Sequence, residues 1–386
     1  MLHKKKICFF STNRADFNYI FSIFAFFQNK NYFDNFLTFN KAYSNVNFIN
    51  ENISNKKNLI PYNFNFIGNS ELNLVREISD FSKIVGKLFS KFKFNYIFLI
   101  GDRYEAHLIA SIANIYNLPV VHVHGGEITE GSYDDKFRHS ITKLSSIHFV
   151  ANNIYKKRVV QMGENKKNVH NTGSPSIDFL KNFNFFDKNY LSIFFKISFD
   201  KPSILICYNS VTNKKKSDKH FKNLLIVLSK FSSEFNIFFS LANNDISCHQ
   251  INKDIKSFVK KFNKKNIIYF KNVGSKVYLS LLKEVDIIVG NSSSGIIEAP
   301  FLGTRTLNIG DRQKGRLMEK SITNITGSIK SINEYFDKNL KKNFRFKKLN
   351  YYYGTGNSIK KMHKYMLNYS NTDDMHKKKF KDIKFI

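Results

Sequence analysis

Short runs of apolar residues rich in Ile, Val and Phe alternate with longer amphipathic stretches along the first half of the chain. Apolar runs of this length are typical of buried strands, and the stretches between them have the spacing of helices with one apolar face. The runs lie at residues 6–12, 96–102, 120–126, 147–152 and 169–173, and helices are predicted at 104–117 and 135–146. Strands that alternate with helices predict a parallel sheet covered on both faces.

The same pattern begins again after a Phe-rich segment, with apolar runs at residues 203–209, 236–243, 266–272, 286–291 and 304–310. The fold class is therefore expected to be α/β, with two doubly wound, Rossmann-like domains and an interdomain cleft of GT-B-like type. The predicted parts are a first domain at 1–175, a connector at 176–200, a second domain at 201–355, and a terminal helix with a frayed basic tail at 356–386. The terminal helix is predicted to cross back to the first domain.

The length of 386 residues is sufficient for two domains that each bury a core. A net charge of +31, from 61 Lys and Arg against 30 Asp and Glu, is typical of proteins that bind nucleic acid or anionic membranes. However, Lys, Asn, Ile, Phe and Tyr are all abundant and Trp is absent, which indicates an AT-rich coding sequence. No stripe of Lys and Arg is interleaved with aromatics. We therefore predict no nucleic-acid partner, although the positive field would attract an anionic substrate.

The cysteines Cys8, Cys207 and Cys248 are too widely spaced for a disulfide framework or a zinc site. Cys8 and Cys207 lie in apolar runs and are expected to be buried. The apolar run near the N-terminus is too short for a signal peptide, and no stretch approaches eighteen uninterrupted apolar residues. These features predict a cytoplasmic protein with no membrane partner.

Charged side chains cluster where the apolar runs of the first domain end. Because ligands bind at the carboxyl ends of strands in open α/β sheets, these positions are candidates for chemistry. They are Arg14, Asp16, Asp102, Arg103, Glu105, His122, His124, Glu127, Glu130, Asp134, Asp135, Arg138 and His139. Carboxylates crowded at one sheet edge repel one another, which raises pKa values and favours proton transfer near neutral pH.

Simpler structural roles compete with the chemical ones. Asp134 and Arg138, like Asp135 and His139, are spaced as i,i+4 pairs on a helix, and Asp134 is equally well explained as a residue that stabilises the helix start. His122 and His124 alternate along a strand and are expected to share one face, as metal ligands would. A third ligand at suitable spacing is missing, so polar packing is favoured and no metal is predicted.

The segment IVGNSSSGIIEAPFLGTRTLNIGDRQKGR, residues 288–316, predicts a strand ending at Asn291, a serine-rich turn and a helix from about Ser294. Main-chain N–H groups at a helix start, with serine hydroxyls beside them, form an anion-binding site. The segment has neither the GxGxxG nor the GK[ST] pattern, so neither motif implies an adenine cofactor. Taken alone, the turn is explained equally well as a helix cap and as a ligand-binding site. Glu298, suited to ribose hydroxyls, and Arg312, suited to phosphate, favour a nucleoside diphosphate.

Three segments, GDRYEA (101–106), HVHGGEITEGSYDDKFRHSITKLSSIHFVANNIYKKRVVQMGE (122–164) and VGNSSSG…GDRQKGR (289–316), resemble the UDP-N-acetylglucosamine 2-epimerase family. The motifs HGGE, DDKFRH and GNSSSGIIEAP are similar to those of its hydrolysing branch, which serves sialic and legionaminic acid synthesis. The resemblance runs from about residue 4 to about residue 368. It implies catalytic carboxylates at Asp102, Glu127 and Asp134, cleft residues at Arg14 and Arg103, and UDP-binding residues at Ser292, Ser293, Glu298 and Arg312. The expected geometry of the turn, and not the resemblance, suggests Ser294 as a further residue near the phosphates.

The resemblance implies elimination of UDP from UDP-N-acetylglucosamine or from UDP-2,4-diacetamido-2,4,6-trideoxyglucose. Hydration of the resulting glycal gives a free manno-configured 2-acetamido sugar and UDP. This route requires no metal or redox cofactor. The family also implies a homo-oligomer, either a dimer or a tetramer.

One position departs from the family pattern. Where the family carries an HPVT-like segment whose His contributes to catalysis, residues 209–212 read NSVT, with Asn209 at the His position. Asn forms hydrogen bonds but does not shuttle protons. A catalytically weakened epimerase is therefore one alternative. The others are a UDP-sugar glycosyltransferase of the same fold and, from a different class, a basic RNA- or membrane-binding protein.

Overall fold

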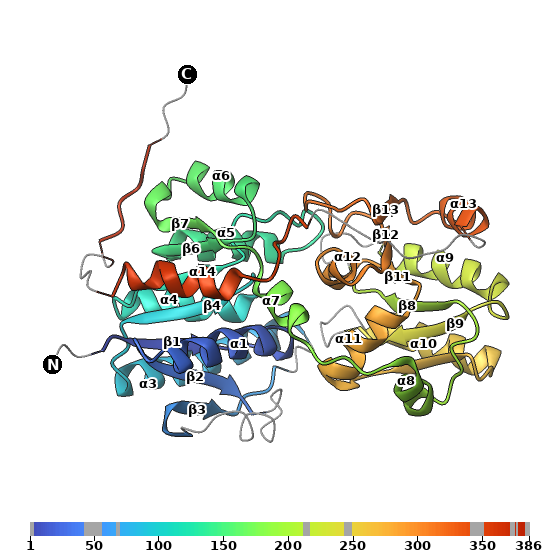
Figure 1. Cartoon of the computed structure of the whole chain (residues 1–386), viewed down its shortest axis with the longest axis horizontal. Helices are drawn as coiled ribbons and strands as arrows, with labels where there is room; N and C mark the ends of the chain where they lie inside the picture. Colours follow the sequence, from blue (N-terminus) through green and yellow to red (C-terminus); the bar gives the residue numbers. More distant parts are fainter. Residues whose placement is uncertain are drawn as a thin grey trace. The chain divides into compact units, whose positions relative to one another are not determined.

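The computed structural model describes residues 4–41, 56–66, 70–210, 217–242, 249–339, 351–370, 375 and 377–382. The chain forms two compact units, each built on its own parallel sheet (Figure 1). The first unit consists of Met1–Glu127, Asp134–Asn182 and Tyr353–Ile386, and the second of Ile128–Tyr133 and Phe183–Tyr352. The predicted α/β class with two Rossmann-like domains is confirmed.

The described part of the first unit contains a seven-stranded parallel sheet in the order β3-β2-β1-β4-β5-β6-β7. The strands are β1 (Lys6–Phe10), β2 (Asp34–Asn40), β3 (Leu59–Tyr62), β4 (Tyr96–Ile100), β5 (Val120–Val123), β6 (Ile147–Val150) and β7 (Val169–Asn171). The strand order reverses between β1 and β4, which are paired neighbours. Loops that leave the carboxyl ends of these two strands diverge to opposite faces of the sheet, and this opens a crevice where ligands bind in such folds.

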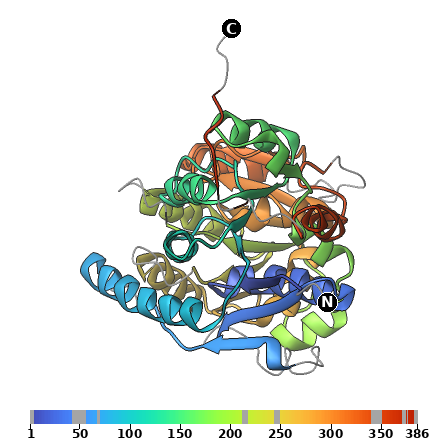
Figure 2. The ribbon, with the colours of Figure 1, turned by 90° about the vertical axis from the view of Figure 1, so that its left-hand side faces the viewer.

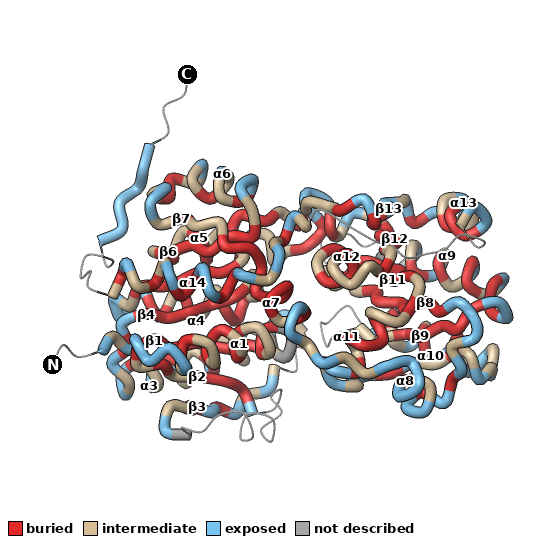
Figure 3. The backbone as a smooth tube through the Cα atoms, viewed as in Figure 1, coloured by how far each residue is buried: buried red, intermediate tan, exposed pale blue. Residues whose placement is uncertain are grey.

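Helices cover both faces of this sheet, as Figure 2 shows. They are α1 (Arg14–Lys30), α3 (Glu71–Lys91), α4 (Tyr104–Ile115), α5 (Asp134–Leu144), α6 (Asn153–Gln161), α7 (Pro175–Lys181) and α14 (Ser358–Leu367), with 3-10 turns η1 (Lys56–Asn58) and η2 (Lys166–Asn168). One apolar cluster joins α1 and α14 to the sheet, and a second joins α3, α4 and α5 to it. The central strands β1, β4, β5 and β6 are therefore buried on both sides, apart from the first residue of β1, as their continuous apolar runs require (Figure 3).

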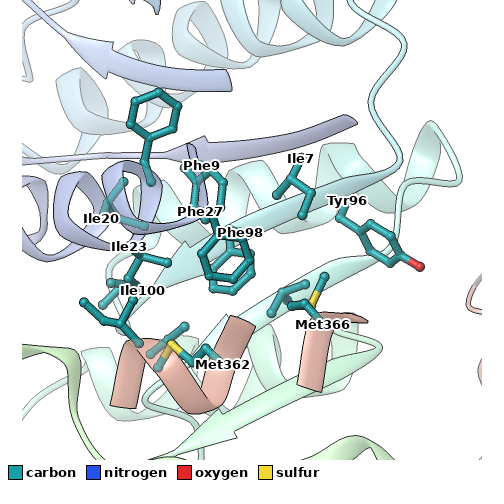
Figure 4. Close-up of a cluster of buried hydrophobic side chains, with 14 of the residues drawn as sticks. Ile7, Phe9, Ile20, Ile23, Phe27, Tyr96, Phe98, Ile100, Met362 and Met366 are labelled. Carbon is teal, nitrogen blue, oxygen red and sulfur yellow. The ribbon is translucent and has the colours of Figure 1, made fainter. Parts of the chain in front are cut away.

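The terminal helix α14 belongs to the first unit, as predicted. Its residues Met362 and Met366 are fully buried against Phe98 and other side chains of the first cluster (Figure 4). The Asp178 carboxylate accepts hydrogen bonds from the main-chain N–H groups of Ser358 (2.8 Å) and Ile359 (3.1 Å). These are N–H groups that a helix start leaves unsatisfied, so a side chain 180 residues earlier caps α14.

The described part of the second unit contains a six-stranded parallel sheet in the order β10-β9-β8-β11-β12-β13. The strands are β8 (Ser203–Cys207), β9 (Asn236–Ser240), β10 (Ile267–Phe270), β11 (Ile287–Gly290), β12 (Arg305–Ile309) and β13 (Ile322–Ile325). The helices are α8 (Lys188–Phe195), α9 (Ser217–Lys230), α10 (His249–Phe262), α11 (Gly274–Glu284), α12 (Glu298–Leu302) and α13 (Ile329–Asn339), with the 3-10 turn η4 (Ser293–Gly295). The order reverses between β8 and β11, so this unit repeats the topology of the first.

Three strands were not predicted, and each lacks the continuous apolar run used to find the others. In β2, polar Asn35 and Thr38 are buried between apolar residues. The edge strand β3 contains Pro61, and β13 has two exposed residues among four. The predicted connector also differs from the structure, because α7 lies in the first unit and α8 in the second.

The basic tail after α14 was expected to be frayed, but residues 377–381 are docked on the first unit. The Phe380 ring lies against Gly163, whose carbonyl accepts from the Lys381 N–H (2.9 Å). Lys378 Nζ lies 2.7 Å from Glu164 Oε2 and donates to main-chain carbonyls at the end of α5 (2.6 and 2.7 Å). A cation at the end of a helix is stabilised by the helix dipole, which explains why this lysine is bound.

Cys8 and Cys207 are buried, as predicted, and burial raises the pKa of both thiols to about 12. Cys248 lies outside the described residues. Among the helices that the structure describes, none combines the length and apolar character needed to cross a membrane.

Glu164 provides a pH-dependent test of the docked tail. Burial alone raises the pKa of this carboxyl, but hydrogen bonds and charges from His148, Lys143 and Lys378 outweigh burial and lower the pKa to about 2. A carboxylate with a lowered folded-state pKa stabilises the fold above its ordinary value of 4.5 and loses this contribution as the pH falls toward 2. We expect the stability difference between wild type and Glu164→Gln to shrink by about 3 kcal/mol across this range.

Urea unfolding of both proteins between pH 7 and pH 2 measures this difference. Asp80→Asn, in an exposed pair with Lys83, is the control and should show little change. A constant difference between wild type and Glu164→Gln would contradict the prediction.

Candidate active site

In the first unit, a buried arginine joins three segments that carry carboxylates. Arg138 on α5 is 1% exposed. Its Nη1 donates to Asp135 Oδ1 (2.8 Å) and to the main-chain oxygen of Glu127 (3.1 Å), and its Nη2 donates to Asp102 Oδ2. The guanidinium therefore fixes the turn after β4, the loop after β5 and the first turn of α5 relative to one another.

Each of these carboxylates has a local reason for its place. Asp102 follows β4 through Gly101, whose φ of +90° lets the chain turn sharply at the switch point. Asp134 and Asp135 occupy the first turn of α5, where negative charge is favoured by the helix dipole. The predicted Asp135–His139 pair is formed (3.5 Å), and Arg138 also pairs with Asp135 at i,i+3. The structural role therefore holds for Asp135, and the catalytic role of Asp134 stays a prediction.

Glu127 is held by a chain of hydrogen bonds that the sequence did not reveal. Its side chain is 1% exposed, and its Oε1 lies 2.6 Å from Nδ1 of His124. The other ring nitrogen of His124 lies 3.1 Å from the Ser174 hydroxyl. Because the carboxylate only accepts, Nδ1 carries the proton and donates. His124 and Ser174 therefore orient Glu127.

The two histidines of this segment do not share a face, contrary to expectation. Strand β5 ends at Val123, and His124 has a φ of 71°, so the alternation of a strand no longer applies. His122 is buried, with Nε2 2.8 Å from the Gly101 carbonyl and Nδ1 3.2 Å from the Thr142 hydroxyl. Burial lowers its pKa to about 3, so a neutral ring donates to Gly101 and supports the turn before Asp102. Among the described residues, no group of three His, Cys, Asp or Glu side chains is arranged to hold a metal.

The predicted arginines lie at the carboxyl ends of β1 and β4. Arg14 is the first residue of α1. Arg103 precedes α4, with its Nε 3.3 Å from Glu105 Oε2 and its guanidinium over the Tyr104 ring. The loop before Arg14 is organised by Asp16, whose carboxylate accepts from the Ser11 hydroxyl (2.6 Å) and the Thr12 N–H (3.0 Å). Burial raises the pKa of Asp16 to about 6.

In the second unit, the serine turn differs from the predicted helix start. Residues Ser293–Gly295 form a 3-10 turn, and the five-residue helix α12 begins only at Glu298. The Thr306 hydroxyl donates to the Gly295 carbonyl (2.6 Å), so this carbonyl is occupied by a side chain and the first helical turn does not continue. The dipole of so short a helix contributes little. The predicted anion-binding site would therefore depend mainly on hydroxyls, local N–H groups and Arg312.

The predicted residues of the second unit lie on three neighbouring segments. The Ser292 hydroxyl accepts from the Ser294 N–H (3.3 Å), and the Ser294 side chain contacts the Tyr278 hydroxyl from α11. Glu298 is buried at the start of α12. Asn209 and Arg312 both bond to Asn291, the residue before the serine run. Asn291 and Tyr278 were not among the predicted site residues, although Asn291 is part of the GNSSSGIIEAP motif.

Comparison with known proteins assigns the family. The family model for UDP-N-acetylglucosamine 2-epimerase matches residues 61–367. The chain belongs to this family. The match includes the three sequence segments that carry the resemblance, strands β4 to β7 of the first sheet and the whole second sheet, so the family resemblance seen in the sequence is confirmed.

Two curated relatives are similar over much of the chain. A GDP/UDP-N,N'-diacetylbacillosamine 2-epimerase (hydrolyzing) of Campylobacter jejuni is 41% identical over 258 residues, which are 67% of this chain and 66% of that protein. The match thus spans slightly less than two thirds of the relative's length. A polysialic acid biosynthesis protein of Escherichia coli is 31% identical over 285 residues, 74% of this chain and 72% of that protein. Both names fit the hydrolysing branch.

Solved structures support the fold independently. The UDP-GlcNAc 2-epimerase of Neisseria meningitidis, bound to UDP-GlcNAc, superposes with a TM-score of 0.76 at 17% identity. The match covers 94% of this chain and 100% of that one. At this identity the similarity establishes the shared two-domain fold.

The Arg138 group leads to a stability prediction. Arg138→Met removes the cation shared by Asp102 and Asp135 while it keeps an apolar stem of similar length. Because this breaks a buried ion pair on one side only, we expect the free energy of unfolding to fall by about 3 kcal/mol. Asp102→Asn combined with Arg138→Met should lose less than the sum of the two single changes, because the double variant leaves no unpaired charge at Asp102.

Urea denaturation of the four proteins measures this coupling. Lys83→Met, in an exposed pair, is the control for loss of a positive charge and should change stability by well under about 1 kcal/mol. Additive losses would contradict the prediction.

Proposed function

We propose that the protein is a hydrolysing UDP-sugar 2-epimerase that releases UDP and a free manno-configured 2-acetamido sugar. The observation that carries this proposal is the grouping of Asp102, Glu127 and the start of α5 around Arg138 at the carboxyl ends of β4 and β5. In a member of this family, several carboxylates fixed at a ligand-binding edge fit a reaction that transfers a proton and stabilises a cation.

The chemistry explains why carboxylates and an anion-binding turn are both needed. The C2 proton of the sugar is not acidic until the C1–O bond to UDP begins to break, because only then does the ring become cationic. Loss of the C2 proton to a carboxylate then forms the C1–C2 double bond of a glycal, and UDP departs with the C1–O electron pair. Water adds its oxygen to C1, and a proton returns to C2 on the opposite face, which gives the free epimerised sugar.

In this proposal Asp102 and Asp134 transfer the protons, and Glu127 stabilises the cationic ring. The fixed orientation of Glu127 by His124 supports this role, since a stabilising charge acts best when it is pre-oriented. Ser292, Ser293, Ser294 and Arg312 bind the diphosphate, and Glu298 binds the ribose. Arg14 and Arg103 stay predicted substrate-binding residues.

We further propose that the sugar is the 2,4-diacetamido-2,4,6-trideoxy type rather than N-acetylglucosamine. The support is the name of the Campylobacter relative, which shares 41% identity, against 31% for the polysialic acid protein. Cytoplasmic location and a dimeric or tetrameric state stay predictions from the sequence.

The proposal is tested by NMR of the protein in D2O with UDP-2,4-diacetamido-2,4,6-trideoxyglucose, with its GDP counterpart and with UDP-N-acetylglucosamine. We expect UDP release and a free manno-configured sugar that carries deuterium at C2, fastest with the first substrate. Fastest turnover of UDP-N-acetylglucosamine would overturn the substrate assignment alone. Bound but intact substrate in all three samples, or release without deuterium at C2, would overturn the reaction.

Position 209 leads to a separate kinetic prediction. The structure bonds Asn209 through its main-chain N–H and carbonyl, so a new side chain at 209 leaves these contacts in place. A histidine at this position adds a group that can transfer a proton or carry positive charge beside the departing diphosphate. We expect Asn209→His to raise kcat at least about tenfold with little change in KM.

Steady-state kinetics by UDP release measures both constants, and Asn209→Ala is the matched control. A kcat for the His variant no higher than that of wild type would show that proton transfer at 209 does not limit the reaction.

A further inference from the structure

Asn291 connects three segments of the second unit. It lies directly after β11 and is 1% exposed. Its Oδ1 accepts from the Asn209 N–H (2.7 Å), and its Nδ2 donates to the Asn209 carbonyl (2.8 Å). Its own carbonyl accepts from Arg312 Nη1 (3.0 Å) and from Gln313 Nε2 (2.9 Å). One buried residue, directly before the serine turn, thus contacts both the loop after β8 and the loop after β12.

Close packing of two strands places Asn291 opposite Asn209. Gly290 pairs in register with Cys207, and a Cβ at Gly290 would lie 2.0 Å from the Cys207 carbonyl oxygen. Only glycine permits this approach, and the φ of +143° at Gly290 also favours glycine. The chain then leaves β11 at a distance where one short amide side chain reaches across to β8.

We propose that Asn291 is the positioning residue of the diphosphate-binding turn. It fixes the main chain at 209 and, through its carbonyl, the guanidinium of Arg312. This inference rests on the proposed binding of a nucleoside diphosphate at the serine turn. The carbonyl uses one N–H group of an arginine that has five, so Arg312 is oriented while it keeps further donors for an anionic ligand.

The chemistry of asparagine suits this role better than that of other residues. Its planar amide donates and accepts at once, and so it satisfies both main-chain groups of Asn209 as a neighbouring strand would. Aspartate accepts but does not donate, and its charge would repel a diphosphate. Alanine does neither and leaves two main-chain groups of Asn209 without these bonds.

The test is isothermal titration calorimetry of the full chain with UDP, which requires no turnover. We expect Asn291→Ala to weaken UDP binding at least about tenfold. Asn236→Ala is the matched control, because Asn236 is also a buried asparagine of the second unit, and its amide donates to main-chain carbonyls of Ser198 and Lys201 at the amino end of the sheet. Thermal unfolding should show lower stability in both variants, with weaker UDP binding only at 291.

Asn291→Asp is the second variant and keeps the shape of the side chain. It keeps the bond from the Asn209 N–H but places a carboxylate oxygen against the Asn209 carbonyl, so it should bind UDP more weakly than wild type. Unchanged UDP affinity in a folded Asn291→Asp or Asn291→Ala protein would overturn the inference.

A double variant separates positioning from general loss of structure. Asn291→Ala keeps the main-chain carbonyl that accepts from Arg312 but removes the side-chain bonds that tie the chain at 291 to that at 209. If these bonds position the carbonyl and thereby Arg312, then Arg312→Ala should weaken UDP binding strongly in wild type and by less than about threefold in the Asn291→Ala background. Fully additive losses would overturn the positioning role. Failure of wild type to bind UDP would overturn the proposed function itself, and is thus distinguished from a failure confined to Asn291.

Discussion

A guanidinium buried to 1% exposure destabilises a fold by several kcal/mol unless opposite charges and hydrogen-bond acceptors surround it. Arg138 meets this requirement by drawing Asp102, Asp135 and the Glu127 carbonyl to one point, although they belong to three different elements. The geometry of the carboxylate group is therefore a condition for burying the arginine. The proposed catalytic groups are thus positioned by the fold itself, which is the pre-organisation that charge stabilisation needs.

In the second unit, the buried polar side chain that connects neighbouring loops is neutral. The strands of this unit reverse order between β8 and β11, as those of the first unit do between β1 and β4, and a buried polar side chain joins the loops there. In the second unit that side chain is the amide of Asn291. The difference in charge suits the proposed ligands. Carboxylates that act on a sugar need a cation beside them, whereas a turn that binds a diphosphate needs donors and no added negative charge.

The first unit also depends on contacts between residues that are distant in the sequence. Asp178 caps α14, and Lys378 contacts Glu164 and the end of α5, the helix that carries Arg138. The C-terminal segment thus stabilises the helix on which the carboxylate group is assembled. From the sequence, this segment could be described only as basic. A lysine that forms such contacts cannot be distinguished in the sequence from a lysine that is exposed to solvent.

The sequence by itself determined the α/β class, the two domains, most strands and the family, because continuous apolar runs and specific motifs are local properties of the chain. It also identified Asp102, Glu127, Asp134 and the serine turn as candidates. Only the tertiary structure decided that Arg138 joins the carboxylate segments, that His124 orients Glu127 and that Asn291 holds Arg312. These roles depend on distances between elements far apart in the chain, and such distances are set by packing and topology rather than by local sequence.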